Sequence, residues 1–138
     1  MLCFENPAGR ILLHSTFVQV VWSTGQRQDA HVMELMDQLL EIGQRQHLDR
    51  LLVDQGIMDS CSVEVEVWFK YDWLTRACLQ FDSGAAAILS GRNLLVRMAT
   101  LGMLRHLLGW TGSFQIRVFY SGEMQEAVTW LSQPSPRA

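Results

Sequence analysis

The chain has 138 residues, of which 49% are hydrophobic and 18% are charged; it can form one core and is too short for two ordinary domains. Its net charge of -3 argues against binding to nucleic-acid phosphates, and its hydrophobicity excludes intrinsic disorder. A typical soluble domain carries roughly 25% charged residues, so apolar surface is left for a partner. We expect one domain over residues 1–132 and a flexible tail over 133–138.

The cysteines and histidines form no metal-binding or catalytic pattern. Cys3, Cys61 and Cys78 are odd in number and lack C-x-x-C spacing, and the four histidines show no i, i+4 pair, so neither a disulfide framework nor a zinc site is expected. The glycines do not match the nucleotide-binding loop motifs. We expect a non-enzymatic cytoplasmic protein with no metal and no cofactor, and no membrane span, since no run of about 18 apolar residues occurs.

The first half of the chain predicts strands followed by a helix and a further strand. Arg10 to His14 and Phe17 to Ser23 are rich in Ile, Leu and Val and follow a turn signal at residues 6–9, which indicates early strands. Between Asp29 and Gln46 the apolar residues recur at steps of three and four, so a helix is expected with Asp29 as its N-cap. Arg50 to Asp54 is typical of a strand buried on both faces.

Residues 62–81 are ambiguous by pattern. The segment Val63 to Val67 alternates like a strand, whereas Val67, Tyr71, Leu74, Cys78 and Phe81 are spaced as on one face of a helix. The length exceeds that of a usual strand, so we favour a helix, with Asp59, Ser60 or Ser62 as its cap.

The second half continues the alternation of strands and helices. Strands are expected at Ala85 to Ser90 and Phe114 to Tyr120, and helices at Asn93 to Leu108 and Gly122 to Ser132, the last capped by Ser121. Such alternation predicts an α/β fold with a mainly parallel central sheet. We expect four to five strands and about four helices.

Three segments resemble the SpoIIAA-like group of the STAS superfamily, small α/β domains named for anti-sigma-factor antagonists and also compared with the lipid-binding SEC14 fold. They are Val20 to Gly25, Leu51 to Asp54 and Val118 to Leu131, and the resemblance covers nearly the whole chain. It implies a single STAS-like domain that acts by protein contact.

The resemblance also implies a regulatory site, because classical STAS antagonists are phosphorylated on a Ser or Thr next to an Asp after the central strand. Here Asp54 ends that strand, and Asp59 and Ser60 precede the next helix. A phosphate on Ser60 would meet free N–H groups at a helix N-terminus, although the acidic residues around it would repel it. The alternative is that Ser60 or Ser62 is only an N-cap.

Two apolar segments are candidates for an interface or a pocket. The aromatic residues Trp68, Phe69 and Trp73 either pack in the core or line a partner surface or apolar pocket. The helix from 93 to 108 is apolar in nearly every direction, so it is either deeply buried or docked against another chain; we favour docking. The residues expected at this contact are Leu95, Val96, Met103 and Leu107.

These observations lead to two hypotheses about function. The first is a non-enzymatic STAS-like regulatory module that binds a protein partner and forms a homodimer through its apolar helix. The alternative is a carrier or sensor of a lipid or another apolar ligand, in analogy to the SEC14 fold.

Overall fold

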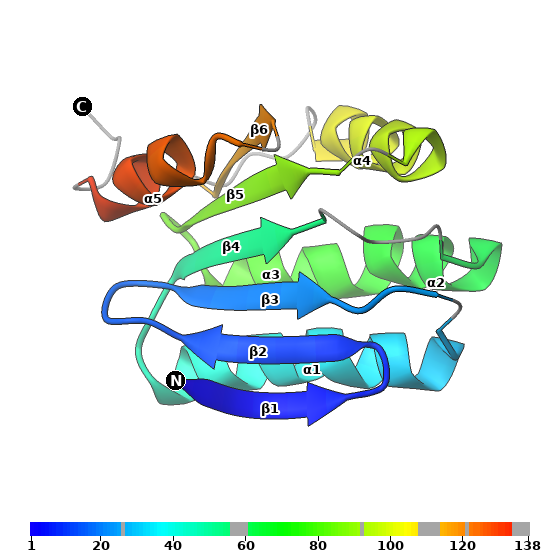
Figure 1. Ribbon diagram of the computed structural model, residues 1–138, viewed down its shortest axis with the longest axis horizontal. Helices are drawn as coiled ribbons and strands as arrows, with labels where there is room; N and C mark the ends of the chain where they lie inside the picture. The colour runs from blue at the N-terminus through cyan, green and yellow to red at the C-terminus, as the bar shows by residue number, and fades with distance from the viewer. Residues whose placement is uncertain (26, 56–60, 92, 108–113, 121, 134–138) are drawn as a thin grey trace.

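The described residues form one six-stranded sheet in the order β1-β2-β3-β4-β5-β6, with helices on both faces (Figure 1). This computed structural model describes residues 1–25, 27–55, 61–91, 93–107, 114–120 and 122–133. The strands are β1 (Leu2–Asn6), β2 (Gly9–Leu13), β3 (Val18–Trp22), β4 (Arg50–Asp54), β5 (Ala85–Ser90) and β6 (Gln115–Tyr120). The helices are α1 (Asp29–Arg45), α2 (Val63–Trp68), the π-helical turn η1 (Phe69–Trp73), α3 (Leu74–Gln80), α4 (Leu94–Leu107) and α5 (Met124–Ser132).

The sequence prediction of four to five strands was wrong, because β1 adds a sixth. Strands β1, β2 and β3 form an antiparallel meander, in which Asn6 Oδ1 accepts a hydrogen bond from the Ala8 N–H at 2.8 Å. A Cβ at Gly9 would collide with the Val21 carbonyl oxygen, so this turn requires glycine. Strand β1 escaped prediction because it is a short edge strand with mostly exposed side chains.

Strands β3, β4, β5 and β6 are parallel and adjacent in chain order, which confirms the mainly parallel sheet. Successive right-handed crossovers in one direction place their helices on one face of the sheet. Helices α1, α2 to α3 and α4 therefore lie on the first face, and α5 packs on β4, β5 and β6 from the second. Because α2, η1 and α3 are continuous, the described residues contain four helical segments, as the sequence predicted.

The core has one apolar cluster on each side of the sheet. On the first face, residues of β2 to β5 pack against α1 and α2 to α3. On the second face, Leu52, Leu89 and Phe119 pack against Ala127 and Leu131 of α5. Every residue of β5 is buried, since helices cover both of its faces.

Helix α1 confirms the predicted apolar stripe and corrects its cap. Val32, Leu35 and Leu39 are among its buried residues. Gln28 occupies the N-cap position, and Asp29 lies inside the first turn, where the helix dipole favours an acidic side chain.

The helical segment from α2 to α3 confirms helix over strand for residues 63–80, and Ser62 is its N-cap. The Ser62 side chain accepts a hydrogen bond from the Val65 N–H at 3.1 Å. The predicted buried face was wrong at Val67 and Tyr71, which are 50% and 62% exposed. Leu74 and Cys78 are buried as predicted. Buried or half-buried residues also recur at steps of four, at Val65, Phe69, Trp73, Ala77 and Phe81.

The π-helical turn explains this spacing. In a regular α-helix each step of four residues rotates the side chain by about 40° beyond a full turn, so residues spaced in this way would drift off one face. A π-helical turn contains more residues per turn. The turn η1 therefore keeps Val65, Phe69 and Trp73 facing the protein interior.

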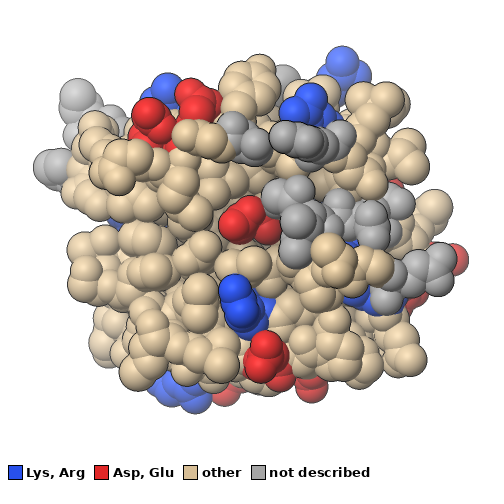
Figure 2. Space-filling view, viewed as in Figure 1, with Lys and Arg blue, Asp and Glu red and all other residues tan. Residues whose placement is uncertain are grey.

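The second face of β1, β2 and β3 is not covered by any described helix. In Figure 1 these strands lie in front of α1, and Figure 2 shows a largely uncharged surface from the same side, with a few charged side chains on it. Gln19 in β3 is nevertheless buried, and its Oε1 lies 2.8 Å from His14 Nε2.

Candidate functional site

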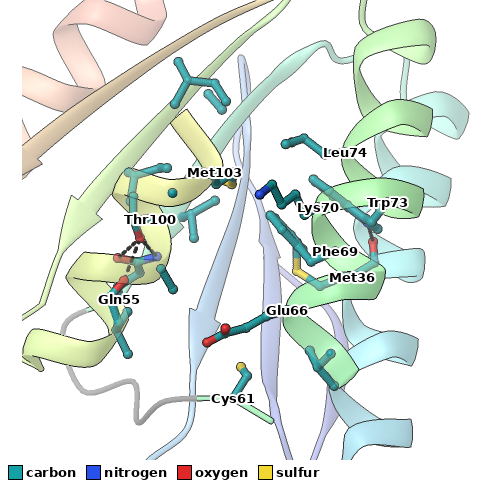
Figure 3. Close-up of a pocket in the computed structure, with 18 of the residues that line it drawn as sticks. Met36, Gln55, Cys61, Glu66, Phe69, Lys70, Trp73, Leu74, Thr100 and Met103 are labelled. Carbon is teal, nitrogen blue, oxygen red and sulfur yellow. Dashed lines mark hydrogen bonds between the residues drawn. The ribbon is translucent and has the colours of Figure 1, made fainter. Parts of the chain in front are cut away.

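A cavity of about 260 Å³ lies on the first face of the sheet, between the helical segment α2 to α3 and helix α4 (Figure 3). Its floor includes Leu51, Val53, Ala86 and Ile88 of the parallel strands. Ligand pockets in proteins typically measure about 300–1,000 Å³, so this space lies close to the lower end of that range. It is therefore large enough for a small organic molecule.

Small residues help to create this space. Ala86 is buried in the centre of the floor, and Ala99 contributes to the wall formed by α4. A Cβ at Gly102 of α4 would meet no atom within 4 Å. At these three positions the sequence places little side-chain volume between the sheet and α4.

The wall on the side of η1 is aromatic. Phe69 and Trp73 are stacked, with ring centroids 4.8 Å apart and an interplanar angle of 11°. The Trp73 indole N–H donates a hydrogen bond of 2.7 Å to the Met36 carbonyl oxygen of α1, which fixes the ring. This pair gives the cavity a rigid apolar surface suited to a flat or chain-like ligand.

The opposite wall is formed by α4, which has apolar residues on two sides. Val96, Thr100 and Met103 line the cavity. The outward side chains Leu94, Leu95, Met98 and Leu101 are each at least 58% exposed. Asn93 begins the helix, and its Oδ1 accepts hydrogen bonds from the N–H groups of Leu95 and Val96 at 2.9 and 3.2 Å.

One polar pair is buried in the α4 wall. Gln55, directly after β4, donates from Nε2 to Thr100 Oγ1 at 3.2 Å. The Thr100 hydroxyl lies 3.0 Å from the Val96 carbonyl oxygen. Both side chains line the cavity and are more than nine-tenths buried, so the pair attaches α4 to the end of β4.

Trp22 and Cys61 form a second polar region of the cavity. The Trp22 indole nitrogen is buried and has no hydrogen-bond partner among the described residues. The Arg27 guanidinium lies 5.7 Å from the Trp22 ring centroid and donates to the Ser23 carbonyl oxygen at 2.8 Å. Burial raises the pKa of the Cys61 thiol, although Arg27 acts in the opposite direction. Cys61 is therefore a neutral thiol at physiological pH.

The charged residues that line the cavity have opposite signs. Glu66 and Lys70 lie on α2 and η1, on the wall opposite Gln55 (Figure 3). Glu66 is exposed and Lys70 is half-buried. Together they add no net charge to the cavity, and the other described residues that line it are neutral.

Several residues predicted for an interface or pocket come together at this cavity. Phe69, Trp73, Val96 and Met103 all line it. The other predicted residues lie elsewhere. Trp68 is half-buried beneath Arg76, whose Cζ lies 5.8 Å from the ring centroid.

The remaining predicted residues do not line the cavity. Leu95 is on the outer side of α4, and the side chain of Leu107 lies outside the described residues. Asp54 is half-buried at the end of β4, whereas Asp59 and Ser60 lie outside the described residues.

Sequence reasoning missed Trp22, Gln55 and Thr100. Trp22 and Gln55 occupy the carboxyl ends of adjacent parallel strands, an edge at which open α/β sheets commonly bind ligands. A polar residue immediately after a buried strand was the available signal for Gln55. The signal for Thr100 was weaker, because it is only a polar residue within an otherwise apolar helix.

Within the described part of the chain, no cluster of His, Cys, Asp and Glu residues could hold a metal ion. None of the helices in those residues is both long and apolar enough to cross a membrane.

No protein-family model, curated protein or solved structure matches this chain.

Proposed function

We propose that this protein binds a small, mainly apolar molecule and acts as its carrier or sensor. The observation that carries the proposal is the cavity of about 260 Å³ between the sheet and α4. Ligand pockets are typically concave and apolar, with a few polar groups that orient the ligand. The stacked Phe69 and Trp73 supply the apolar surface, and Gln55 and Thr100 supply polar groups.

The proposal assigns no chemical step to the protein. Among the described residues, the uncharged polar side-chain groups that line the cavity are a carboxamide, a hydroxyl, two indole N–H groups and a protonated thiol. These groups can donate or accept hydrogen bonds, but none of them is paired with a base in the way an activated nucleophile requires. Binding without turnover is the function that they support best.

We also propose that the chain is a SpoIIAA-like STAS domain. The order of three early strands followed by alternating helices and strands supports this relationship, as do the sequence segments that carry the resemblance. The fold alone does not specify a ligand, so the proposal of ligand binding depends on the cavity.

Filling the cavity tests the proposed function. In Ala99→Phe, a ring should occupy the space beside α4 and weaken binding of naphthalene at least tenfold, while thermal stability is kept or raised. Binding can be followed through the fluorescence of Trp22 and Trp73, which line the cavity.

The matched control is Ala30→Phe, which adds the same ring at an exposed position of α1 and should leave binding unchanged. Native mass spectrometry of freshly purified protein would reveal a bound molecule directly. Naphthalene affinity that is equal in Ala99→Phe and in the unmodified protein would refute the proposal.

A second candidate function is self-association through the outer side of α4. Leu94, Leu95, Met98 and Leu101 together form an exposed apolar strip along this helix, and such a strip favours contact with another chain. We propose a second copy of this protein as the occupant, because two such strips would bury one another in a symmetric dimer.

A charge on the strip tests this candidate. Leu95→Glu should convert a dimer to a monomer in light scattering at high micromolar concentration, because a carboxylate would have to be desolvated at the contact. Leu79→Glu, at an exposed leucine of α3, is the matched control and should leave the dimer intact. A native protein that stays monomeric at these concentrations would exclude this contact.

A further inference from the structure

The carboxamide of Gln55 has hydrogen-bonding capacity that the described residues do not fully use. A glutamine side chain has two N–H donors and an oxygen that can accept two hydrogen bonds. One N–H donates to Thr100 Oγ1 at 3.2 Å. Thr100 has a single hydroxyl proton, and the Val96 carbonyl oxygen at 3.0 Å is closer to it than Gln55 Oε1 at 3.5 Å.

The remaining Gln55 groups are therefore left for a ligand. With the Thr100 proton directed to Val96, Gln55 keeps one N–H without a partner among the described residues, and its Oε1 has only the longer contact of 3.5 Å to Thr100 Oγ1. The side chain is 9% exposed and lines the cavity. A buried donor without a partner and a buried acceptor with only a long hydrogen bond both cost free energy, so a molecule that satisfies both would be held preferentially.

The charges around the cavity favour an uncharged molecule. The described lining residues are neutral except for Glu66 and Lys70, which have opposite signs on a more exposed wall. The Arg27 guanidinium lies next to Trp22 but does not line the cavity. An ionised ligand would lose its hydration without gaining a buried counter-charge. The buried indole N–H of Trp22 adds one more donor, not a charge.

We propose that the ligand is a neutral, mainly apolar molecule with a group that both donates and accepts hydrogen bonds, such as a hydroxyl or a carboxamide, and that Gln55 determines this specificity. This inference rests on the proposed function of the cavity. The ligand's polar group pairs with the Gln55 carboxamide, and its apolar body lies against Phe69 and Trp73.

Three probes of nearly equal shape separate the possibilities by isothermal titration calorimetry at pH 7. They are naphthalene, 2-naphthol, which is neutral and carries a hydroxyl, and 2-naphthoate, which is an anion. We expect 2-naphthol to bind about tenfold more tightly than naphthalene, as one or two satisfied hydrogen bonds allow. We expect 2-naphthoate to bind most weakly.

The variant Gln55→Leu should remove the preference for 2-naphthol, so that its affinities for naphthalene and 2-naphthol lie within about threefold of each other. Thr100 keeps its hydrogen bond to Val96 in this variant. If the leucine variant does not fold, Gln55→Met offers a straight side chain of the same length. The matched control is Gln19→Leu, at a buried glutamine of β3 outside the cavity, which should retain the preference.

The outcomes distinguish this inference from the function on which it rests. Equal affinity for naphthalene and 2-naphthol, tightest binding of 2-naphthoate, or an unchanged preference in Gln55→Leu would overturn the role of Gln55 while the cavity still binds. Failure of all three probes to bind would overturn both proposals.

Discussion

Cys78 is a buried thiol of α3, on the side of the helix that faces the interior. Burial raises its pKa to about 11, from an ordinary value of 9.0. The folded protein therefore holds this proton more tightly than the unfolded chain does. The resulting stabilisation is complete below about pH 9 and is lost as the pH rises toward 11.

We predict that the free energy of unfolding decreases between pH 9 and pH 11, and that Cys78→Ala reduces this decrease. Urea unfolding at a series of pH values measures the free energy of unfolding of each variant. The control Cys3→Ala removes an exposed thiol and should retain the full decrease. If the two variants show the same pH dependence, Cys78 does not contribute to it.

At the scale of single residues, the sequence identified the apolar side chains of the site better than the polar ones. Phe69, Trp73, Val96 and Met103 were recognisable because clustered aromatic and aliphatic residues must be buried somewhere. The role of Gln55 depends on the position of the Thr100 hydroxyl, which accepts a hydrogen bond from the Gln55 carboxamide. That contact joins residues 45 positions apart, so no local pattern could predict it.

The π-helical turn is the element that departs most from regular helical geometry. We therefore predict that this segment tolerates the deletion of one residue. Deletion of Tyr71, which is exposed within η1, should convert the turn to regular α-helix, because the buried positions around it would then be separated by three and four residues. We expect the variant to fold with a nearly unchanged circular dichroism spectrum. Its affinity for naphthalene should fall, because Phe69 and Trp73 lose their stacking.

Deletion of Gln38 in the regular helix α1 is the contrasting control. It should rotate Val32 and Met36 by about 100° relative to Leu39 and Ile42, all four of which are buried, and should prevent stable folding. Comparable stability of the two deletion variants would contradict our account of η1.

At the scale of elements, periodicity predicted α1 because this helix buries one face, and a short continuous apolar run predicted β4 as a strand buried on both faces. It failed for the buried face of the segment from α2 to α3, because a helical wheel assumes the same rotation at every residue. Steps of four from Val65 to Phe81 were visible in the sequence. They would have indicated a π-helical turn if the aromatic residues had been assigned to the buried face.

Among the described elements, burial is greatest at the centre of the sheet, and few residues of α4 are buried. Strand β5 is buried throughout, whereas α4 exposes one apolar side and borders the cavity on the other. Amide hydrogen exchange should therefore be slowest in β4 and β5 and faster in α4 than in α1, because segments with fewer buried contacts open more easily.

Saturation with naphthalene should slow exchange in α4 more than in α1, because a bound molecule would contact Val96 and Met103. Hydrogen-exchange mass spectrometry can measure both helices in one experiment. Equal slowing of the two helices would indicate general stabilisation and not contact with α4.

The order of elements along the chain was predictable for most of the molecule, because parallel strands joined by helices leave a strong alternating pattern. The number of strands was not predictable, because β1 pairs through its backbone and exposes Leu2 and Glu5, which leaves no buried apolar face in the sequence pattern. The cavity was also not predictable in its dimensions. Its size depends on how far α4 lies from the sheet, a distance that composition and periodicity do not encode.

The small side chains of Ala86 and Ala99 give the cavity a property that bulky walls would not allow. Both residues lie on regular elements, in β5 and α4, so either can be exchanged for valine or leucine without a new backbone conformation. Each added methylene would remove a share of the space within an unchanged scaffold. Related proteins could thus diverge in the size of molecule they accept through single substitutions at these two positions.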